Sequence, residues 1–132
     1  MRPKPVWVEK REALVIHDLQ LVEHGGPSGV RDLALLESAL VRPKNLWAYS
    51  PERASLPRLA AAAYAFGIAS NHPFVDGNKR TALVVSYTFL ALNGIEVKSS
   101  REEAYLIFLG FAKTSVNEED LGLWFAEHAS PL

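Results

Sequence analysis

The segment 77–92 constrains the fold most, because after its first turn it is apolar on nearly every face of a helix. A helix that is apolar all round is buried among other elements, whereas a surface helix keeps a polar face. Its apolar residues are Ala82, Leu83, Val84, Val85, Tyr87, Phe89, Leu90 and Leu92. Asn93-Gly94 follows as a stop signal, since glycine adopts the left-handed conformation that ends many helices. The segment therefore predicts a central helix.

The rest of the chain supplies helices to surround it. The spacing of apolar residues and the capping residues at segment ends predict helices over 9–22, 31–41, 56–70, 99–113 and 117–128. Pro43 is expected to end the second of these, so that residues 43–55 form a connection. Residues 95–97 are expected to form a short extended link. The prediction is an all-α, single-domain bundle over residues 1–132, with about six helices around the helix 77–92.

The charge and cysteine content narrow the class of protein. The net charge is −1, from 14 basic and 15 acidic residues, which indicates no broad basic surface for a nucleic-acid backbone. The chain has no cysteine, which excludes disulfides, thiolate metal sites and cysteine nucleophiles. Its longest apolar run, 81–92, is shorter than the roughly 20 residues that span a bilayer. We therefore expect a cytoplasmic protein that binds neither a membrane nor, directly, nucleic acid.

The junction at residues 71–80 concentrates polar chemistry between two apolar helices. Each residue alone has an ordinary structural explanation: a helix break, a cap or a solvated first turn. Lys79 and Arg80 together resist that explanation, because cations in the first turn of a helix are disfavoured by about 0.3–1 kcal/mol. Free backbone N–H groups after Gly77 form an anion site at the same helix end, so a bound phosphate would suit both features.

Two further side chains of the junction fit chemistry on a phosphate. Asp76 can hold a divalent cation that bridges phosphate oxygens. His72 stands just before, and histidine is the side chain that most often abstracts protons near neutral pH. A base, a metal ligand and a phosphate cradle within nine positions indicate phosphoryl or nucleotidyl transfer.

The run His72-Pro73-Phe74-x-Asp76-Gly77-Asn78-Lys79-Arg80 resembles the signature loop of the Fic/Doc superfamily, and within it the death-on-curing toxins. The likeness extends over almost the whole chain, to Gly25-Gly26, Gly29, residues 35–40, residues 89–94 and Trp124. The resemblance implies a Fic/Doc domain with His72 as the general base and Asp76 as the ligand of the Mg²⁺ that accompanies ATP. It implies a phosphate-binding role for Gly77, Asn78, Lys79 and Arg80, and Phe74 as the apolar anchor of the loop.

Two positions separate this chain from the AMP-transferring branch. That branch usually has glycine in place of Lys79 and a second arginine in place of Leu83. The resemblance therefore favours a kinase that transfers the γ-phosphate of ATP to a threonine or serine hydroxyl, with translation elongation factor Tu as the kind of target, and so inhibits translation. It also implies a cognate antitoxin that inhibits in trans. Two alternatives stay open: an AMP-transferase that tolerates Lys79, and a catalytically silent binding module.

Overall fold

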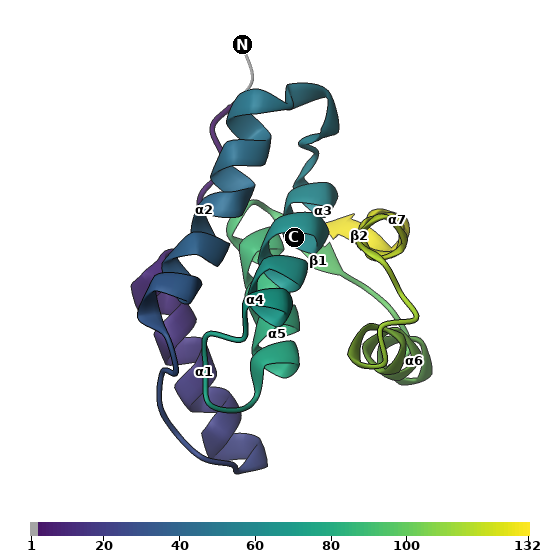
Figure 1. Ribbon diagram of the computed structural model, residues 1–132. Coiled ribbons are helices and arrows are strands. Elements are labelled where there is room, and N and C mark those ends of the chain that lie inside the picture. The colour runs from purple at the N-terminus through teal and green to yellow at the C-terminus, as the bar shows by residue number, and fades with distance from the viewer. Residues whose placement is uncertain (1–2) are drawn as a thin grey trace.

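The computed structural model describes residues 3–132, and α5 (Asn78–Leu92) runs through its middle (Figure 1). The other helices are α1 (Lys10–His24), α2 (Leu33–Tyr49), α3 (Leu56–Arg58), α4 (Phe66–Asn71), α6 (Arg101–Ala112) and α7 (Glu118–His128). A 3₁₀ turn, η1 (Pro51–Arg53), follows α2, and a π-helical segment, η2 (Leu59–Ala65), joins α3 to α4 as one continuous helix. The prediction of an all-α bundle is confirmed. Within residues 3–132, no helix is long and apolar enough to cross a membrane.

Two helical segments share the centre of the bundle. In α5, Val85, Phe89 and Leu90 are fully buried, as the apolar pattern predicts. The segment α3–η2–α4 is buried just as deeply at Leu59 and Tyr64, and α2 and α7 pack against η2. In Figure 1, α1 and α2 lie on one side of the α4–α5 pair, and α6 and α7 lie on the other. The loop between α4 and α5 is thus flanked from both sides.

The prediction that Pro43 ends the second helix is wrong, because α2 continues through it to Tyr49. Proline removes one backbone hydrogen bond and crowds the preceding turn, which usually breaks a helix. Here Pro43 itself is buried on the same face as Leu36 and Leu40. Burial of that apolar face against η2 and α4 offsets the lost hydrogen bond. Residues 43–49 are therefore helix, and the connection begins only at Ser50.

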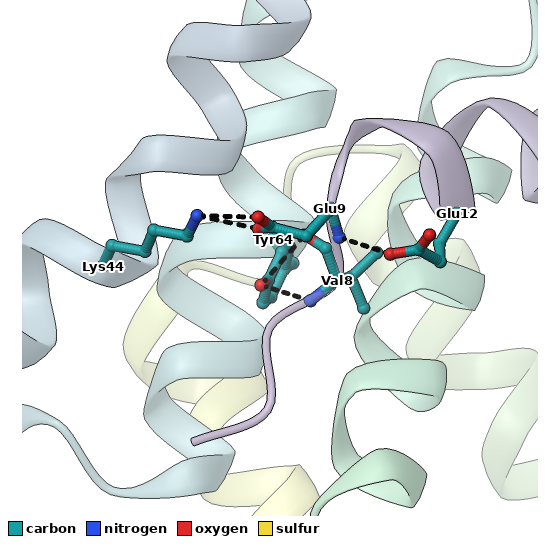
Figure 2. Close-up of polar contacts among 5 residues, drawn as sticks. All are labelled: Val8, Glu9, Glu12, Lys44 and Tyr64. Atoms are coloured by element: carbon teal, nitrogen blue, oxygen red, sulfur yellow. Dashed lines mark hydrogen bonds and ion pairs between the residues drawn. The ribbon is translucent and has the colours of Figure 1, made fainter. Parts of the chain in front are cut away.

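The segment before α1 is fastened to the core by side chains from distant elements (Figure 2). The Tyr64 hydroxyl accepts a hydrogen bond from Val8 N at 2.9 Å and donates to Val8 O at 3.3 Å. Lys44 pairs with the Glu9 carboxylate at 2.7 Å. Glu12 accepts a hydrogen bond from Glu9 N at 3.1 Å, which caps the start of α1. These contacts hold the residues at which α1 begins against the core.

Replacing Tyr64 with phenylalanine is expected to lower the free energy of unfolding by about 1–3 kcal/mol, because a buried main-chain N–H loses its acceptor. Urea denaturation monitored by circular dichroism measures the change. Tyr49→Phe is the matched control, since Tyr49 is 82% exposed and its change should stay within about 0.5 kcal/mol. Equal losses in the two variants would show that the Val8 bonds contribute nothing.

The C-terminal end forms a small sheet that the sequence did not indicate. The extended link β1 (Ile95–Val97) pairs antiparallel with β2 (Ala129–Pro131), in the register Glu96 to Ser130. Just before β2, His128 Nδ1 donates to Trp124 O and Nε2 contacts Glu103 Oε2, each at 2.8 Å. Both ring nitrogens face acceptors, so the ring is best satisfied as the cation. This ion pair links α7 to α6.

The same ion pair gives the stability of the fold a defined pH dependence. The hydrogen bond to Glu103 and then the one to Trp124 O raise the pKa of His128 above 6.5, and the bond from His128 lowers the pKa of Glu103 below 4.5. A raised histidine pKa stabilises the fold below about 6.5, and this contribution is lost as the pH rises through the folded-state value. The carboxylate's contribution is lost instead as the pH falls through the lowered pKa of Glu103.

We therefore expect the melting temperatures of the wild type and His128→Gln to differ most between about pH 5 and 6.5 and to converge above pH 8. Thermal denaturation across this pH range measures the difference. A gap that stays constant up to pH 9 would contradict the assignment of the cation to His128.

Candidate active site

The loop between α4 and α5 is held along its backbone by the segment before α2. Arg31 donates from Nε to His72 O at 2.7 Å and from Nη2 to Asn71 O at 3.0 Å. The N–H groups of Arg31 and Asp32 both donate to Pro73 O, at 2.7 and 3.0 Å. His72 adopts the left-handed conformation, with φ of 50°, directly after α4. A cation on the last carbonyls of a helix is the arrangement that the helix dipole favours.

The inner side of the loop is closed by side chains of its own and of α1. Asn78 accepts from Phe74 N at 2.9 Å and donates to Phe74 O at 3.0 Å, so its amide bridges the loop. Phe74 is 1% exposed, and its ring stacks on His17 with centroids 3.8 Å apart. Gly77, with φ of 75°, then begins α5. These contacts hold the inner side of the loop against α1 and the start of α5.

A cavity of about 500 Å³ opens in front of this loop. The loop and the first turn of α5 form one wall, α1 forms a second through Gln20 and Leu21, and α6 forms a third through Phe108 and Ala112. The residues of the loop and of this first turn that line it are His72, Val75, Asp76, Gly77, Asn78, Lys79 and Arg80. Apart from the anchor Phe74, the structure thus brings all the site residues expected from the sequence to a single cavity.

The side chains of His72 and Asp76 are exposed to this cavity and make no hydrogen bond or ion pair with the residues that the structure describes. Asp76 lies against the backbone of Gly26, since a Cβ on Gly26 would fall 2.7 Å from Asp76 Oδ2. Across residues 3–132, no three histidine or carboxylate side chains gather into a metal cluster. A single carboxylate without a partner among the described residues, in a cavity that also contains a helix start, fits Mg²⁺, which usually binds one or two carboxylates, phosphate oxygens and water.

The two cationic side chains of the site, Lys79 and Arg80, both contact α6, which the loop sequence does not indicate. Lys79 Nζ donates to Ala112 O, at the C-terminal end of α6, where a cation is favoured. This contact offsets the cost of placing Lys79 at the start of α5. Arg80 lies over the ring of Phe108, with Cζ 5.1 Å from its centroid, and within 3.5 Å of His24 Nε2. The side-chain amide of Asn78 forms hydrogen bonds with the backbone of Phe74, so Asn78 can offer an anion only its backbone N–H.

Three features of the site lack a clear sequence signal. Phe108 lies in a helix nearly thirty positions beyond the loop, and nothing in its spacing connects it to Arg80. Arg31 is one of many surface arginines in the sequence, although the structure places it on His72 O. His17 is 2% exposed and bonds the loop, whereas the adjacent Asp18 is exposed. Only the apolar neighbours of His17 in α1, Ala13 and Ile16, indicate that position 17 faces inward.

The comparisons with known proteins agree with this site. A model of the Fic/DOC family matches residues 7–90. The chain is 42% identical over 78 residues to Toxin Doc of Mycolicibacterium smegmatis, covering 58% of each protein. It is 34% identical over 99 residues to Protein kinase doc of Escherichia phage P1, covering 75% of this chain and 77% of the phage protein. These matches confirm the resemblance seen in the loop and its surroundings, and the chain belongs to the Fic/DOC family.

Proposed function

We propose that the protein is a Doc-type toxin: a kinase that transfers the γ-phosphate of ATP to a threonine or serine hydroxyl of a translation elongation factor. One observation carries the proposal. The free imidazole of His72, the free carboxylate of Asp76 and the first turn of α5 all border one cavity. The names of two relatives, a toxin and a protein kinase, support the same activity.

In the proposed reaction, His72 takes the proton of the incoming hydroxyl. The hydroxyl oxygen bonds to the γ-phosphorus while the bond from that phosphorus to the β–γ bridging oxygen breaks, and ADP leaves with the electron pair. The N–H groups at the start of α5, together with Arg80, hold the phosphates and stabilise their charge. Asp76 would hold Mg²⁺, which when bound neutralises the phosphate oxygens.

The arginine content of the cavity favours γ-phosphate transfer over AMP transfer. Leu83, which stands where AMP-transferring members have a second arginine, is 5% exposed in the core. No side chain from that position enters the cavity. Among the described residues that line the cavity, Arg80 is therefore the only arginine. A silent binding module has less support, because the imidazole of His72 and the carboxylate of Asp76 both border the cavity without a partner among the described residues.

The proposal includes a partner that neutralises the toxin, as the name of the mycobacterial relative suggests. We expect this partner to be a small protein from the same operon that suppresses the kinase activity of the toxin in trans. Co-expression followed by size-exclusion chromatography tests this part. Free toxin in the presence of every neighbouring gene product would exclude it.

The test of the activity uses purified protein, Mg²⁺, a bacterial extract and ATP labelled at either the α- or the γ-phosphate. Label transferred to a protein only from γ-labelled ATP, at a band of the size of an elongation factor, is the expected result. Mass spectrometry of that band then identifies the modified hydroxyl. Transfer from α-labelled ATP would establish AMP transfer instead. Absence of both, with folded protein free of any inhibitor, would favour the binding module.

A further inference from the structure

His17 is a buried polar side chain whose hydrogen bond goes to the loop and not to its own helix. It lies on α1 and is 2% exposed, on the face that also buries Ala13 and Ile16. A buried polar group needs a partner. Its partner is a main-chain carbonyl, since Nε2 donates to Asp76 O at 2.8 Å. A histidine that only filled the core could be replaced by an apolar ring, whereas this one is directed at one peptide group.

The ring of His17 lies against three residues of the loop. It stacks on Phe74 with the ring planes 5° apart. It bonds the carbonyl of Asp76. Its Cδ2 and Nε2 would each lie 3.9 Å from a Cβ on Gly77, so the backbone of Gly77 runs close along the ring edge. One side chain from α1 therefore supports the turn that leads into α5.

The hydrogen bond from His17 to Asp76 O also determines the direction of the Gly77 N–H, which belongs to the same peptide group. In a trans peptide the C=O and N–H point in opposite directions. Because Asp76 O points inward at buried His17, the N–H of Gly77 points outward, on the side of the cavity that Gly77 lines. Glycine tolerates φ on both sides of zero, so nothing in Gly77 itself, at φ of 75°, prevents this peptide from flipping.

We propose that His17 is a positioning residue: it locks the Asp76–Gly77 peptide so that Gly77 N–H is offered to a phosphate oxygen and the Asp76 carboxylate stays beside it. This inference rests on the proposed function, in which that end of the cavity binds the phosphates and Mg²⁺. His17 touches neither of them and acts only through the peptide. The carboxylate is confined from its other side by Gly26.

The experiment compares two replacements that separate the ring from the donor. His17→Phe keeps the stacking on Phe74 but has no N–H for Asp76 O. His17→Gln gives up the ring but carries an amide N–H at a similar distance from the backbone. Ile16→Ala is the control, because it removes buried volume from the same helix turn without touching the hydrogen bond. Calorimetry measures the affinity for ATP with Mg²⁺, and NMR follows the backbone amide of Gly77.

His17→Phe is expected to weaken Mg-ATP binding about tenfold and to shift or broaden the Gly77 amide signal. His17→Gln should restore both to within about threefold of the wild type, a rescue that a purely structural role would not give. Ile16→Ala should melt at a lower temperature with unchanged affinity. An unchanged Gly77 signal and affinity in His17→Phe would overturn the inference.

Two other results are also decisive. If His17→Phe does not fold, His17→Asn replaces it, because the asparagine amide is too short to reach Asp76 O and the same loss is expected. If the wild type binds no nucleotide, the proposed function fails. The Gly77 amide then decides alone: a shift in His17→Phe that His17→Gln reverses supports the lock on the peptide, and no shift refutes it.

Discussion

Replacing His72 with alanine is expected to lower kcat for phosphate transfer by about 10²–10⁴-fold, the usual contribution of a general base. The affinity for ATP should change less than about twofold, because the imidazole makes no hydrogen bond or ion pair with the described residues that hold the loop. Calorimetry and the labelled-ATP assay measure the two quantities. The loss would appear in turnover and not in binding, which is the pattern of an interaction made only in the transition state.

His72→Ala needs a second variant as a control, because the backbone of His72 is left-handed. Its φ of 50° is left-handed, where alanine is strained by roughly 1–2 kcal/mol but asparagine is tolerated. His72→Asn should therefore melt close to the wild type and be as inactive as His72→Ala. If asparagine restored turnover, the loss in the alanine variant would come from backbone strain. Wild-type turnover in both variants would remove His72 from the mechanism.

The parts of the fold that the sequence predicts well are those in which local pattern and tertiary position agree. Residues 82–92 are apolar on nearly every face, which predicts a buried position, and α5 indeed lies at the centre. The loop can be located from the sequence for a related reason. Gly77 marks the left-handed start of α5, and the polar residues of the loop stand within a few positions of it in the sequence. Local chemistry alone specifies both features.

Where the sequence misleads, a distant element decides. Pro43 is buried inside α2, and α2 packs against η2 and α4, which no local window of the sequence contains. Residues 129–131 become a strand only because β1 offers an unpaired edge beside them. The third wall of the cavity, with Phe108, depends on how α6 packs and has no local signature.

Gly26→Ala is expected to reduce Mg²⁺-dependent transfer at least about tenfold, through Asp76. A Cβ at this position would fall 2.7 Å from Asp76 Oδ2, so the carboxylate must move from its place against Gly26. A carboxylate displaced by even about 1 Å loses its geometry toward the metal and the phosphates. The rate measured against Mg²⁺ concentration should show a raised Mg²⁺ requirement, which extra Mg²⁺ partly relieves.

Gly29→Ala provides a closely matched control for this prediction. Gly29 has a φ of 115°, against 114° for Gly26, so both alanines bear similar backbone strain of about 1–3 kcal/mol. A Cβ on Gly29 would meet only Val75 Cγ2, at an ordinary 3.7 Å. The two variants should therefore melt at similar temperatures while only Gly26→Ala changes the Mg²⁺ requirement. Equal losses of activity would mean that strain in the segment before α2, and not the position of Asp76, limits the reaction.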